Sequence, residues 1–413
     1  MRVHVYVGPS CPLAALTRRH PDLVPHGPAS HGDLFDQGLR PGDVAVIIDG
    51  VYHHQLALRH KEILDAMARG VTVLGAASIG ALRAAELGGH GMVGVGAIHG
   101  WYRDGILDGD DEVAVAQRAE PPYDAVTVPM VNVRAALSAA VLAGVLDTVE
   151  VNPILDRTRR VYYPTRSAQR VLEVLRAAGG PGLSRWYEQR LAADPYAFDQ
   201  KRRDTLDAVD AAHRLSPQGL AEPDAGDDRD WRTEFHRRWR GHFHADRHRV
   251  TYQQLFHPDF PQTWWRFLLV AQPGLRERAE ALAGPAARRW PDTTAGRDRL
   301  AALFGLEPDL DDPRHRAVLL SGESQTDRAA VRDCLRRTAE HLHRRPERRL
   351  TAISEDTCRR LLADAWRTGH DLDREAVRRG FPSVRRAATA LRPFAIGYLQ
   401  GVTAGPREVL RCG

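Results

Sequence analysis

One serine stands where a buried strand is expected to turn into a helix, a position that suits acyl-transfer chemistry. Residues 71–74 form a β-branched and aliphatic run, and the residues after Ser78 favour a helix. Gly75 and Gly80 on either side allow a sharp turn and a close approach of other groups. A hydroxyl there lies beside unpaired backbone N–H groups at the positive end of a helix, where an oxyanion can be held. The pattern is close to the nucleophile elbow Gly-x-Ser-x-Gly, with Ala76 in the first glycine position.

Candidate residues around this serine each have a structural explanation beside the chemical one. Serine is among the best N-cap residues, so helix capping explains Ser78 as well as catalysis does. Arg83 either orients an anion near Ser78 or pairs with Glu86, three residues further on. His60 falls within an apolar stripe, where it is either a satisfied core histidine or a functional one. The sequence leaves these alternatives open.

Lysine is rare in this chain, which has Lys61 and Lys201 beside 56 arginines. A bias this strong most simply reflects the coding genome. Of the two basic side chains, lysine alone can lose its proton when it is desolvated. Each lysine is therefore a candidate for work that arginine cannot do.

Short apolar runs predict a parallel sheet in the first part of the chain. They do not alternate with polar residues, as is typical of strands that are covered on both faces. Strands that alternate with helices indicate βαβ units and a doubly wound α/β sheet of flavodoxin- or Rossmann-like type. The predicted strands are residues 3–7, 44–48, 71–74 and 92–95, the predicted helices are residues 53–69, 79–87 and 110–119, and residues 11–38 contain a crossover.

Three of the predicted strands are followed by glycine and a polar side chain. Gly8 and Ser10 follow the first strand, Asp49 and Gly50 follow the second, and residues 75–78 follow the third. Ligands bind at the carboxyl ends of the strands in open α/β sheets. The sequence therefore predicts one rim that carries these candidate residues.

Two predicted helices have distinct faces. Lys61 lies at the edge of the apolar face of the helix over residues 53–69, and Glu62 points away from that face. The helix over residues 79–87 has a small-residue face suited to close packing on the sheet. The apolar face consists of Leu56, His60, Ile63, Leu64 and Met67, and the small face consists of Gly80, Ala81, Ala84 and Ala85.

Two clusters have the composition of metal ligands, and both have a simpler explanation. Asp108-Gly-Asp-Asp-Glu112 is either a divalent-metal cluster or the acidic first turn of the helix over residues 110–119. His242-Phe-His-Ala-Asp-Arg-His248 resembles the His-x-His-x-Asp-His pattern of binuclear zinc hydrolases. It has one extra residue before the last histidine, and no buried strand leads into it. We assign no metal to the candidate site.

Length, hydropathy and cysteine spacing limit the class of protein. A chain of 413 residues is long enough for about two or three domains. No run reaches the roughly 18 apolar residues of a membrane span, and the N-terminus is too short and too alternating for a signal peptide. Cys11, Cys334, Cys358 and Cys412 have neither disulfide nor metal spacing, which predicts a reduced, cytoplasmic protein.

Charge is distributed unevenly along the chain. Residues 1–150 carry 11 Lys and Arg against 17 Asp and Glu, whereas residues 151–413 carry 47 against 36. The basic second part indicates an acidic partner. We favour a protein over nucleic acid, because arginines alternate with acidic residues and no aromatic–basic RNA-binding motif is present.

Helical periodicity dominates after residue 165. Residues 216–230 are rich in Pro, Gly and Asp, which predicts a linker.

Taken in order along the chain, these motifs resemble the TfuA-like family. The resemblance covers residues 3–165, which implies a TfuA-like α/β domain over residues 1–165 and an Arg-rich, mainly helical region over residues 166–413. Cys11 stands where an apolar residue is expected, so no role is carried over to it. The matching segments are Gly8-Pro-Ser10, Ile48-Asp-Gly-Val51, His60-Lys-Glu-Ile-Leu64, Gly75-Ala-Ala-Ser-Ile-Gly-Ala-Leu-Arg-Ala-Ala-Glu-Leu87, Gly91-Met-Val-Gly-Val-Gly96 and Asp110-Asp-Glu-Val-Ala114.

The resemblance implies a partner enzyme. TfuA-like proteins accompany YcaO enzymes, which use ATP to activate a peptide amide and, with the TfuA-like protein, install sulfur to give a thioamide during RiPP biosynthesis. The implied role is that of a hydrolase for sulfur transfer. It would cleave the C-terminal thiocarboxylate of a small ubiquitin-like sulfur carrier protein and pass sulfide to YcaO. No intrinsic cofactor is implied, and the precursor peptide would be met through YcaO.

Two other functions stay open. The family resemblance also fits a non-catalytic activator or scaffold of YcaO. A phosphate- or nucleotide-binding module is the third hypothesis, although no Gly-x-Gly-x-x-Gly or Walker pattern follows any predicted strand. The sequence does not fix the oligomeric state, and a homo-oligomer is compatible with it.

On the hydrolase hypothesis the rim residues take roles in acyl chemistry. Ser78 is the nucleophile, Lys61 or His60 is its base, and Asp49 orients that base. A lysine base requires burial that lowers its pKa from the ordinary value of about 10.4. Backbone N–H groups after the serine hold the oxyanion, and glycines line the groove for the thin carrier tail. These substrate- and oxyanion-binding residues are Gly8, Ser10, Gly50, Gly75, Ile79, Gly80 and Arg83.

Overall fold

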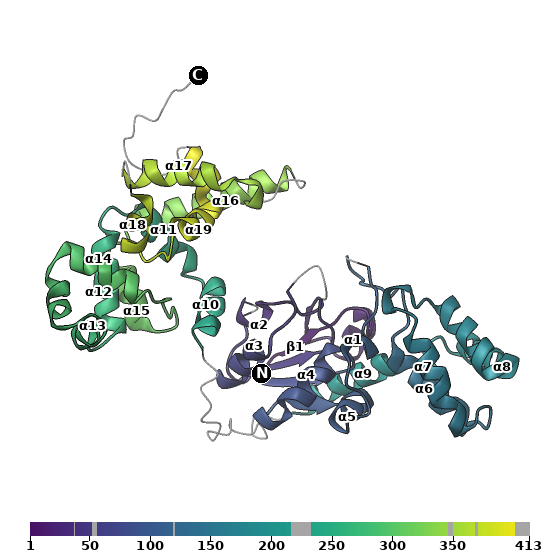
Figure 1. Ribbon diagram of the computed structural model, residues 1–413. Helices are drawn as coiled ribbons and strands as arrows, with labels where there is room; N and C mark the ends of the chain where they lie inside the picture. The colour runs from purple at the N-terminus through teal and green to yellow at the C-terminus, as the bar shows by residue number, and fades with distance from the viewer. Residues whose placement is uncertain are drawn as a thin grey trace. The chain divides into compact units, whose positions relative to one another are not determined.

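The computed structural model describes residues 1–36, 38–51, 56–118, 120–215, 233–345, 350–367 and 371–400. The chain forms two compact units, Met1–Trp231 and Arg232–Gly413, and each is described by itself (Figure 1). The linker predicted at residues 216–230 and the first turn of the helix predicted over residues 53–69 lie outside the described residues. Within the described ranges, no helix is both long and apolar enough to cross a membrane.

Five parallel strands form the centre of the first unit, which confirms the predicted parallel α/β sheet. Their spatial order is β2-β1-β3-β4-β5, the order of flavodoxin-like doubly wound folds. Four strands follow the predicted apolar runs, and the short β2 lies in the crossover over residues 11–38. The strands are β1 Val3–Tyr6, β2 Val24–His26, β3 Val44–Ile47, β4 Thr72–Ala76 and β5 Val93–Val95.

The pairing register brings the carboxyl ends of three strands to one edge of the sheet. Tyr6 of β1 lies opposite Ile47 of β3, and Ile47 lies opposite Gly75 of β4. The turns that follow β1, β3 and β4 therefore leave the sheet side by side.

Most helices of the first unit cover this sheet (Figure 1). In chain order the helices of this unit are α1 Leu13–Arg19, α2 Asp33–Asp36, α3 His60–Ala68, α4 Ile79–Leu87, α5 Ala97–Arg103, α6 Met130–Leu142, α7 Thr148–Arg159, α8 Ala168–Ala193 and α9 Gln200–Arg214, with the 3-10 turns η1 Gly88–His90, η2 Asp110–Glu112 and η3 Tyr163–Thr165. Of these, α6, α7 and α8 pack together to one side of the sheet with a core of their own. The last helix, α9, lies far beyond residue 165, where the family-like region was predicted to end.

Alternate strand side chains enter two separate hydrophobic cores, as the period of two in a strand requires. On one face, Val5 and Val46 pack with Val209 of α9. On the other face, the neighbouring strand residues pack with Ile63 of α3 and Ala84 of α4. The sheet is therefore covered on both faces, and one cover comes from a helix distant in sequence.

The helix predicted over residues 53–69 is shorter in the structure, and its faces differ from the prediction. It begins at His60. Leu56 and His60 were expected on the core face, yet Leu56 is 62% exposed and the His60 side chain is 46% exposed. Glu62 was expected to point away from the core and is fully buried. Its carboxylate accepts a hydrogen bond from the Arg59 N–H at the start of α3. Because this capping bond holds Glu62 in the interior, the helix buries the face that carries Glu62.

Two other helix predictions have different outcomes. The helix predicted over residues 79–87 has the same bounds as α4. On its small-residue face, Ala84 packs with the strands, whereas Ala81 packs with Ile98 and Tyr102 of α5. The helix predicted over residues 110–119 is limited to the single turn η2. The chain after that turn is extended, and Gln117 forms a β-bridge with a residue further on.

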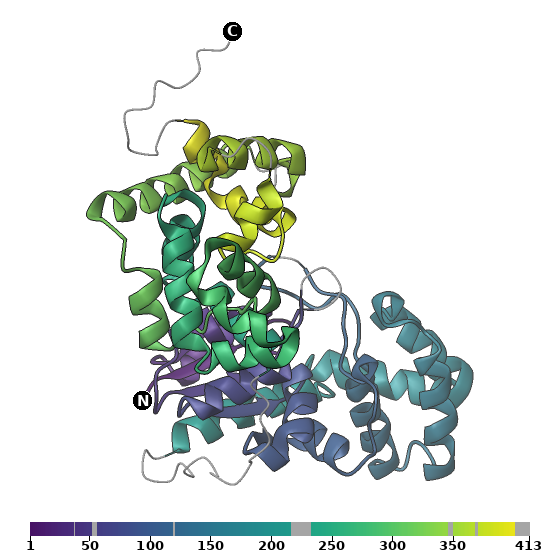
Figure 2. The same ribbon diagram turned by 60° about the vertical axis from the view of Figure 1, so that its left-hand side comes forward.

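The second unit is helical in its described residues, which confirms the predicted helical C-terminal region (Figure 2). One of its cores includes Trp366 and Phe394, and another includes Trp264 and Phe267. Its helices are α10 Glu234–Phe243, α11 Arg247–Phe256, α12 Phe260–Ala271, α13 Leu275–Ala283, α14 Thr294–Leu303, α15 Pro313–Leu319, α16 Gln325–His343, α17 Glu355–Trp366, α18 Leu372–Arg378 and α19 Val384–Leu399, with the 3-10 turns η4 Pro285–Asp292 and η5 Leu350–Ala352.

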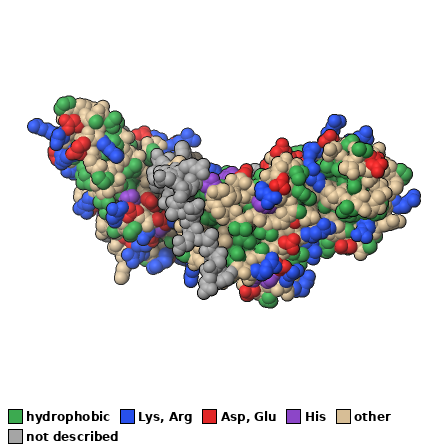
Figure 3. All heavy atoms as spheres, turned by 90° about the horizontal axis from the view of Figure 1, so that it is seen from below, with side chains coloured by type: hydrophobic (Ala, Val, Ile, Leu, Met, Phe, Trp, Pro, Cys, Tyr) green, Lys and Arg blue, Asp and Glu red, His purple; other side chains and the backbone are tan. Residues whose placement is uncertain are grey.

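Basic and acidic side chains are interspersed on the surface drawn in Figure 3. Many arginines of the second unit are paired within the unit, such as Arg374 with Asp298 at 2.7 Å and Arg276 with Asp292 at 2.8 Å. The excess of arginine is thus partly offset locally, in line with the alternation in the sequence.

Candidate functional site

The candidate site lies at the edge where β1 and β3 end. In a sheet of order 2-1-3-4-5, the chain leaves β1 toward one side and β3 toward the other, and in folds of this order ligands bind at the carboxyl ends of these strands. The turn Gly8–Ser10 follows β1, and Asp49 follows β3. The structure therefore brings these predicted rim residues together.

A buried carboxylate holds the two turns in place. Asp49 is 2% exposed. Its Oδ2 accepts hydrogen bonds from the backbone N–H groups of Gly8 at 2.9 Å and Ser10 at 3.0 Å. Its Oδ1 accepts one from the Ser10 hydroxyl at 2.6 Å. The Gly8–Ser10 turn is thus organised around a carboxylate from the neighbouring strand.

The charge opposite Asp49 comes from a lysine that the assignment of site residues missed. Lys201 of α9 has its Nζ 3.6 Å from Asp49 Oδ1, and this ammonium donates a hydrogen bond to the Val113 carbonyl at 3.0 Å. Burial lowers the pKa of Lys201, against the charges of Asp49 and Asp199, which raise it. The rarity of lysine had singled out both lysines, but nothing local in the sequence connects Lys201 with the rim.

Ser78 stands at the turn from β4 to α4. It is buried, and its backbone N–H donates to the Ala76 carbonyl at 2.7 Å. The residue before it, Ala77, has φ 63°, a left-handed conformation that is unfavourable for a non-glycine residue. In the described structure the Ser78 hydroxyl makes no capping hydrogen bond at α4. Ser78 therefore occupies the N-cap position, but its side chain does not cap the helix.

Glycines pack this turn against β3. A Cβ on Gly80 would lie 1.8 Å from the Ile47 carbonyl oxygen, and a Cβ on Gly75 would lie 2.1 Å from the Gly80 carbonyl oxygen. The Gly80 N–H donates to the Ile48 carbonyl at 3.2 Å. This hydrogen bond conflicts with the oxyanion role predicted for Gly80, whereas the role of the Ile79 N–H stays a prediction. Gly75 and Gly80 serve close backbone packing.

The predicted bases lie at the start of α3, next to α4. His60 Nε2 is 2.7 Å from Glu86 Oε2, and Arg83 Nη1 donates to the same carboxylate at 2.6 Å. Arg83 thus forms the pair with Glu86 that the sequence offered as one alternative. Its Nε is buried and has no hydrogen-bond partner among the described residues. His60 is not a core histidine, and Lys61 beside it is half-buried.

The acidic run over residues 108–112 has a structural role. Glu112 is 3% exposed and accepts hydrogen bonds from Arg134 of α6 and Arg159 of α7, at 2.9 Å in the shortest contacts. Burial acts to raise the pKa of Glu112, and the two guanidinium groups outweigh it, so the pKa is lowered. Two arginines in contact with this carboxylate leave no reason to invoke a metal there.

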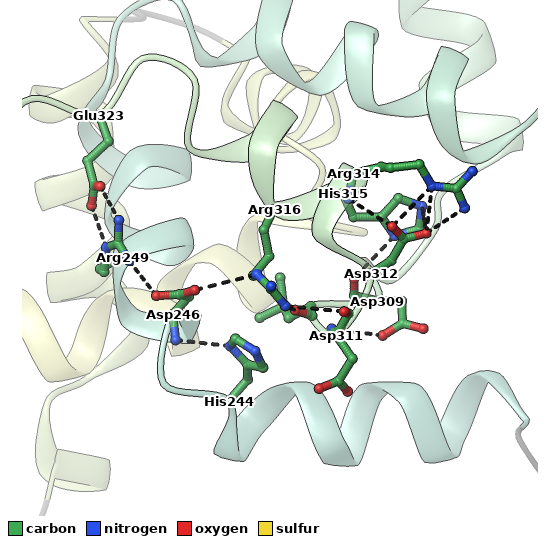
Figure 4. Close-up of polar contacts among 11 residues, drawn as sticks. His244, Asp246, Arg249, Asp309, Asp311, Asp312, Arg314, His315, Arg316 and Glu323 are labelled. Atoms are coloured by element: carbon green, nitrogen blue, oxygen red, sulfur yellow. Dashed lines mark hydrogen bonds and ion pairs between the residues drawn. The ribbon is translucent and has the colours of Figure 1, made fainter. Parts of the chain in front are cut away.

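The histidine-rich motif in the second unit is also held by ion pairs (Figure 4). Asp246 interacts with Arg249 and, at 3.8 Å, with Arg316, and its backbone N–H donates to His244 Nδ1 at 3.0 Å. Asp246 of the motif is thus engaged by arginines, and the side chain of His242 lies outside the described residues. Among the described residues, no three His, Cys, Asp or Glu side chains are grouped so that they could hold a metal ion.

The described cysteines are buried. Burial raises the pKa of Cys11 to about 11, so its thiol is protonated at neutral pH. Cys334 and Cys358 lie in the core of the second unit, and Cys412 lies outside the described residues. Cys11 is therefore no reactive thiolate, although it follows the rim turn.

Comparison with known families gives one match. The family model described as TfuA-like protein matches residues 49–167 of the chain. The match begins at Asp49 and includes Ser78 and η2, whereas the Gly8–Ser10 turn and Lys201 lie outside it. No curated protein matches the chain.

Proposed function

From the match of residues 49–167 to the TfuA-like family model, we propose that this chain supplies sulfur to a YcaO enzyme during peptide thioamidation. The proposed reaction is hydrolysis of the C-terminal thiocarboxylate of a small ubiquitin-like sulfur carrier protein. Its products are the carrier carboxylate and sulfide, which passes to YcaO. YcaO itself would use ATP to activate the peptide amide.

One observation carries this proposal: Ser78 has the N-cap position of α4, but its hydroxyl is not used as a cap. It follows a residue with φ 63° at the junction of a buried strand and a helix. Strain of this kind is stored at functional sites more often than elsewhere. A buried hydroxyl beside a helix N-terminus has the surroundings that a nucleophile in acyl transfer needs.

The proposed chemistry proceeds in two balanced steps. Ser78 Oγ attacks the carbonyl carbon of the thiocarboxylate, and a base takes the hydroxyl proton. The tetrahedral intermediate then expels the sulfur as hydrosulfide and leaves the carrier esterified to Ser78. Water attacks the ester, the carrier leaves as its carboxylate, and the serine regains its proton.

The base in this scheme is His60, with Lys61 as the neighbouring candidate that variants distinguish. His60 is bound by Glu86 in the last turn of α4, eight residues beyond Ser78, so its side chain would have to turn toward the N-terminus of the helix to act as the base. Arg83 shares that carboxylate and has a buried Nε without a partner in the described structure. Its positive charge suits the anionic thiocarboxylate and the oxyanion that follows.

The rim turn argues against the nucleotide-binding hypothesis. In doubly wound folds, backbone N–H groups after β1 are a natural site for phosphate. Here the N–H groups of Gly8 and Ser10 already donate to the protein's own carboxylate, Asp49. A phosphate would have to displace a buried carboxylate of the same charge.

The experiment is to mix the purified full-length protein, without YcaO or ATP, with a thiocarboxylated carrier protein. Sulfide release and the conversion of the carrier from thiocarboxylate to carboxylate are followed together. Release supports the hydrolase, and parallel assays of His60→Gln and Lys61→Met identify the base by an expected loss of at least about 100-fold. Stimulation of YcaO without any release would instead show a non-catalytic activator.

A further inference from the structure

Helix α9 brings a lysine ammonium into the interior beneath the β1–β3 edge. The Lys201 side chain is 4% exposed, and the Asp49 carboxylate that faces it is 2% exposed. Its ammonium lies against the Asp49 carboxylate and the Val113 carbonyl. Any effect of Lys201 on the site must therefore pass through the groups that it contacts, Asp49 and the Val113 carbonyl.

The Gly8–Ser10 turn needs Asp49 in its ionised form. All three hydrogen bonds to Asp49 from this turn come from donors, two backbone N–H groups and one hydroxyl. Protonation of Oδ1 would place a second donor against the Ser10 hydroxyl. A buried carboxylate is stable in ionised form when a counter-charge and hydrogen bonds compensate for lost hydration.

Other charged groups nearby do not replace Lys201 in this role. Asp199, the N-cap of α9, carries the same sign as Asp49, and its carboxylate already accepts from Asn132 Nδ2 at 3.1 Å and from the Arg202 N–H. The Arg202 guanidinium lies over the Tyr196 ring, 4.2 Å from its centroid. The ammonium of Lys201 is thus the cation that contacts Asp49 in the described structure.

We propose that Lys201 is a positioning residue of the site: acting through Asp49, it fixes the Gly8–Ser10 turn in the conformation that receives the carrier tail. The part concerning the carrier tail rests on the proposed function, whereas the dependence of the turn on Lys201 does not. A lysine suits this position because a compact ammonium has few donors to satisfy in the interior. A guanidinium would bring five N–H donors to a space that offers the Asp49 and Val113 oxygens.

The test compares three variants of the full-length protein by hydrogen–deuterium exchange of peptides covering residues 3–11. Lys201→Met removes the ammonium, and Lys201→Gln keeps a donor for Val113 without the charge. Arg134→Met is the matched control, because Arg134 binds Glu112, the residue before Val113, without contacting Asp49. Melting curves check that each variant is folded.

We expect Lys201→Met and Lys201→Gln to speed exchange at Gly8 and Ser10 by about tenfold, and Arg134→Met to change it by less than about twofold. Unchanged exchange in both Lys201 variants, or an equal rise in Arg134→Met, would overturn the proposal. If one Lys201 variant does not fold, the other decides.

Kinetics separates this proposal from the proposed function. If the wild-type protein releases sulfide, Lys201→Gln should lower kcat by about tenfold with KM for the carrier changed by less than about threefold. A variant that keeps the wild-type kcat would contradict the positioning role. If the wild-type protein releases no sulfide, the proposed function fails, and the exchange of the Gly8–Ser10 turn still decides the role of Lys201.

Discussion

Two buried carboxylates in the first unit, Asp49 and Glu112, are satisfied in different ways. Glu112 is bound by Arg134 and Arg159, which tie η2 to α6 and α7. Asp49 instead directs its oxygens to a turn at the edge of the sheet, and its charge is balanced by Lys201 at 3.6 Å.

This difference distinguishes a carboxylate that stabilises the fold, Glu112, from one that organises the candidate site, Asp49. Guanidinium groups keep their protons and bind carboxylates in a fixed fork, which favours a permanent clamp between helices. Asp49 instead organises the backbone N–H groups of the Gly8–Ser10 turn at the carboxyl ends of β1 and β3. We therefore expect Glu112 to contribute mainly to stability and Asp49 mainly to the proposed function.

The largest expected effect on stability is that of Glu112→Gln. Removing this buried charge leaves two arginines without their shared partner, and we expect the free energy of unfolding to fall by about 3 kcal/mol at pH 7. The folded-state pKa of Glu112 is lowered below its ordinary value of 4.5, so its contribution is fully present above that pH. The contribution is lost as pH falls through the lowered pKa. Denaturant melts from pH 7 to pH 3 should therefore show the wild type and the variant converging in acid.

Asp49→Asn should mainly reduce activity, whereas Glu112→Gln mainly reduces stability. The amide cannot accept all three hydrogen bonds from the Gly8–Ser10 turn, so the turn is misplaced, and we expect sulfide release to fall by about 100-fold. Glu112→Gln, assayed well below its melting temperature, should keep release within about threefold of wild type. Equal losses of activity in the two variants would remove the distinction between site and scaffold.

The two arginines of the Glu112 clamp should differ according to their exposure. The Arg134 side chain is 14% exposed and that of Arg159 is 40% exposed. Solvent screens the more exposed pair, so we expect Arg134→Met to cost about 2 kcal/mol of stability and Arg159→Met about 1 kcal/mol. Chemical denaturation measures both, and the opposite ranking would show that the clamp is not organised by burial.

Cys11 should give the smallest effect, although it lies next to the turn held by Asp49. Its pKa of about 11 keeps the thiol protonated, and the side chain is buried. We expect no alkylation of Cys11 by iodoacetamide at pH 8 in the folded protein, and Cys11→Ala should keep sulfide release within about twofold. Rapid labelling with loss of activity would bring this thiol into the mechanism.

Local patterns predicted the sheet and its rim well. Buried parallel strands leave continuous apolar runs, and the turns after β1, β3 and β4 carry the glycines and polar residues that ligand-binding edges share. The bounds of α4 also followed from sequence, because a small-residue face and a sharp Gly-rich turn are both local signals.

Tertiary placement explains what local patterns missed. Lys201 lies 152 residues beyond Asp49, and only the return of α9 to the sheet brings the two side chains together. Glu62 was assigned to the outer face by helical periodicity, but hydrogen bonds from the N–H groups of Gly32 and of the N-cap Arg59 hold its carboxylate inside. The acidic residues 110–112 form a single turn rather than begin a long helix, and the arginines of α6 and α7 that bind Glu112 are distant in sequence.

The most direct test of the central claim is sulfide release by Ser78→Ala beside the wild-type protein, each mixed with thiocarboxylated carrier in the absence of YcaO and ATP. The account predicts release by the wild type and a loss of at least about a thousandfold in Ser78→Ala, with the carrier remaining a thiocarboxylate. Full release by Ser78→Ala would contradict the assignment of this serine as the nucleophile.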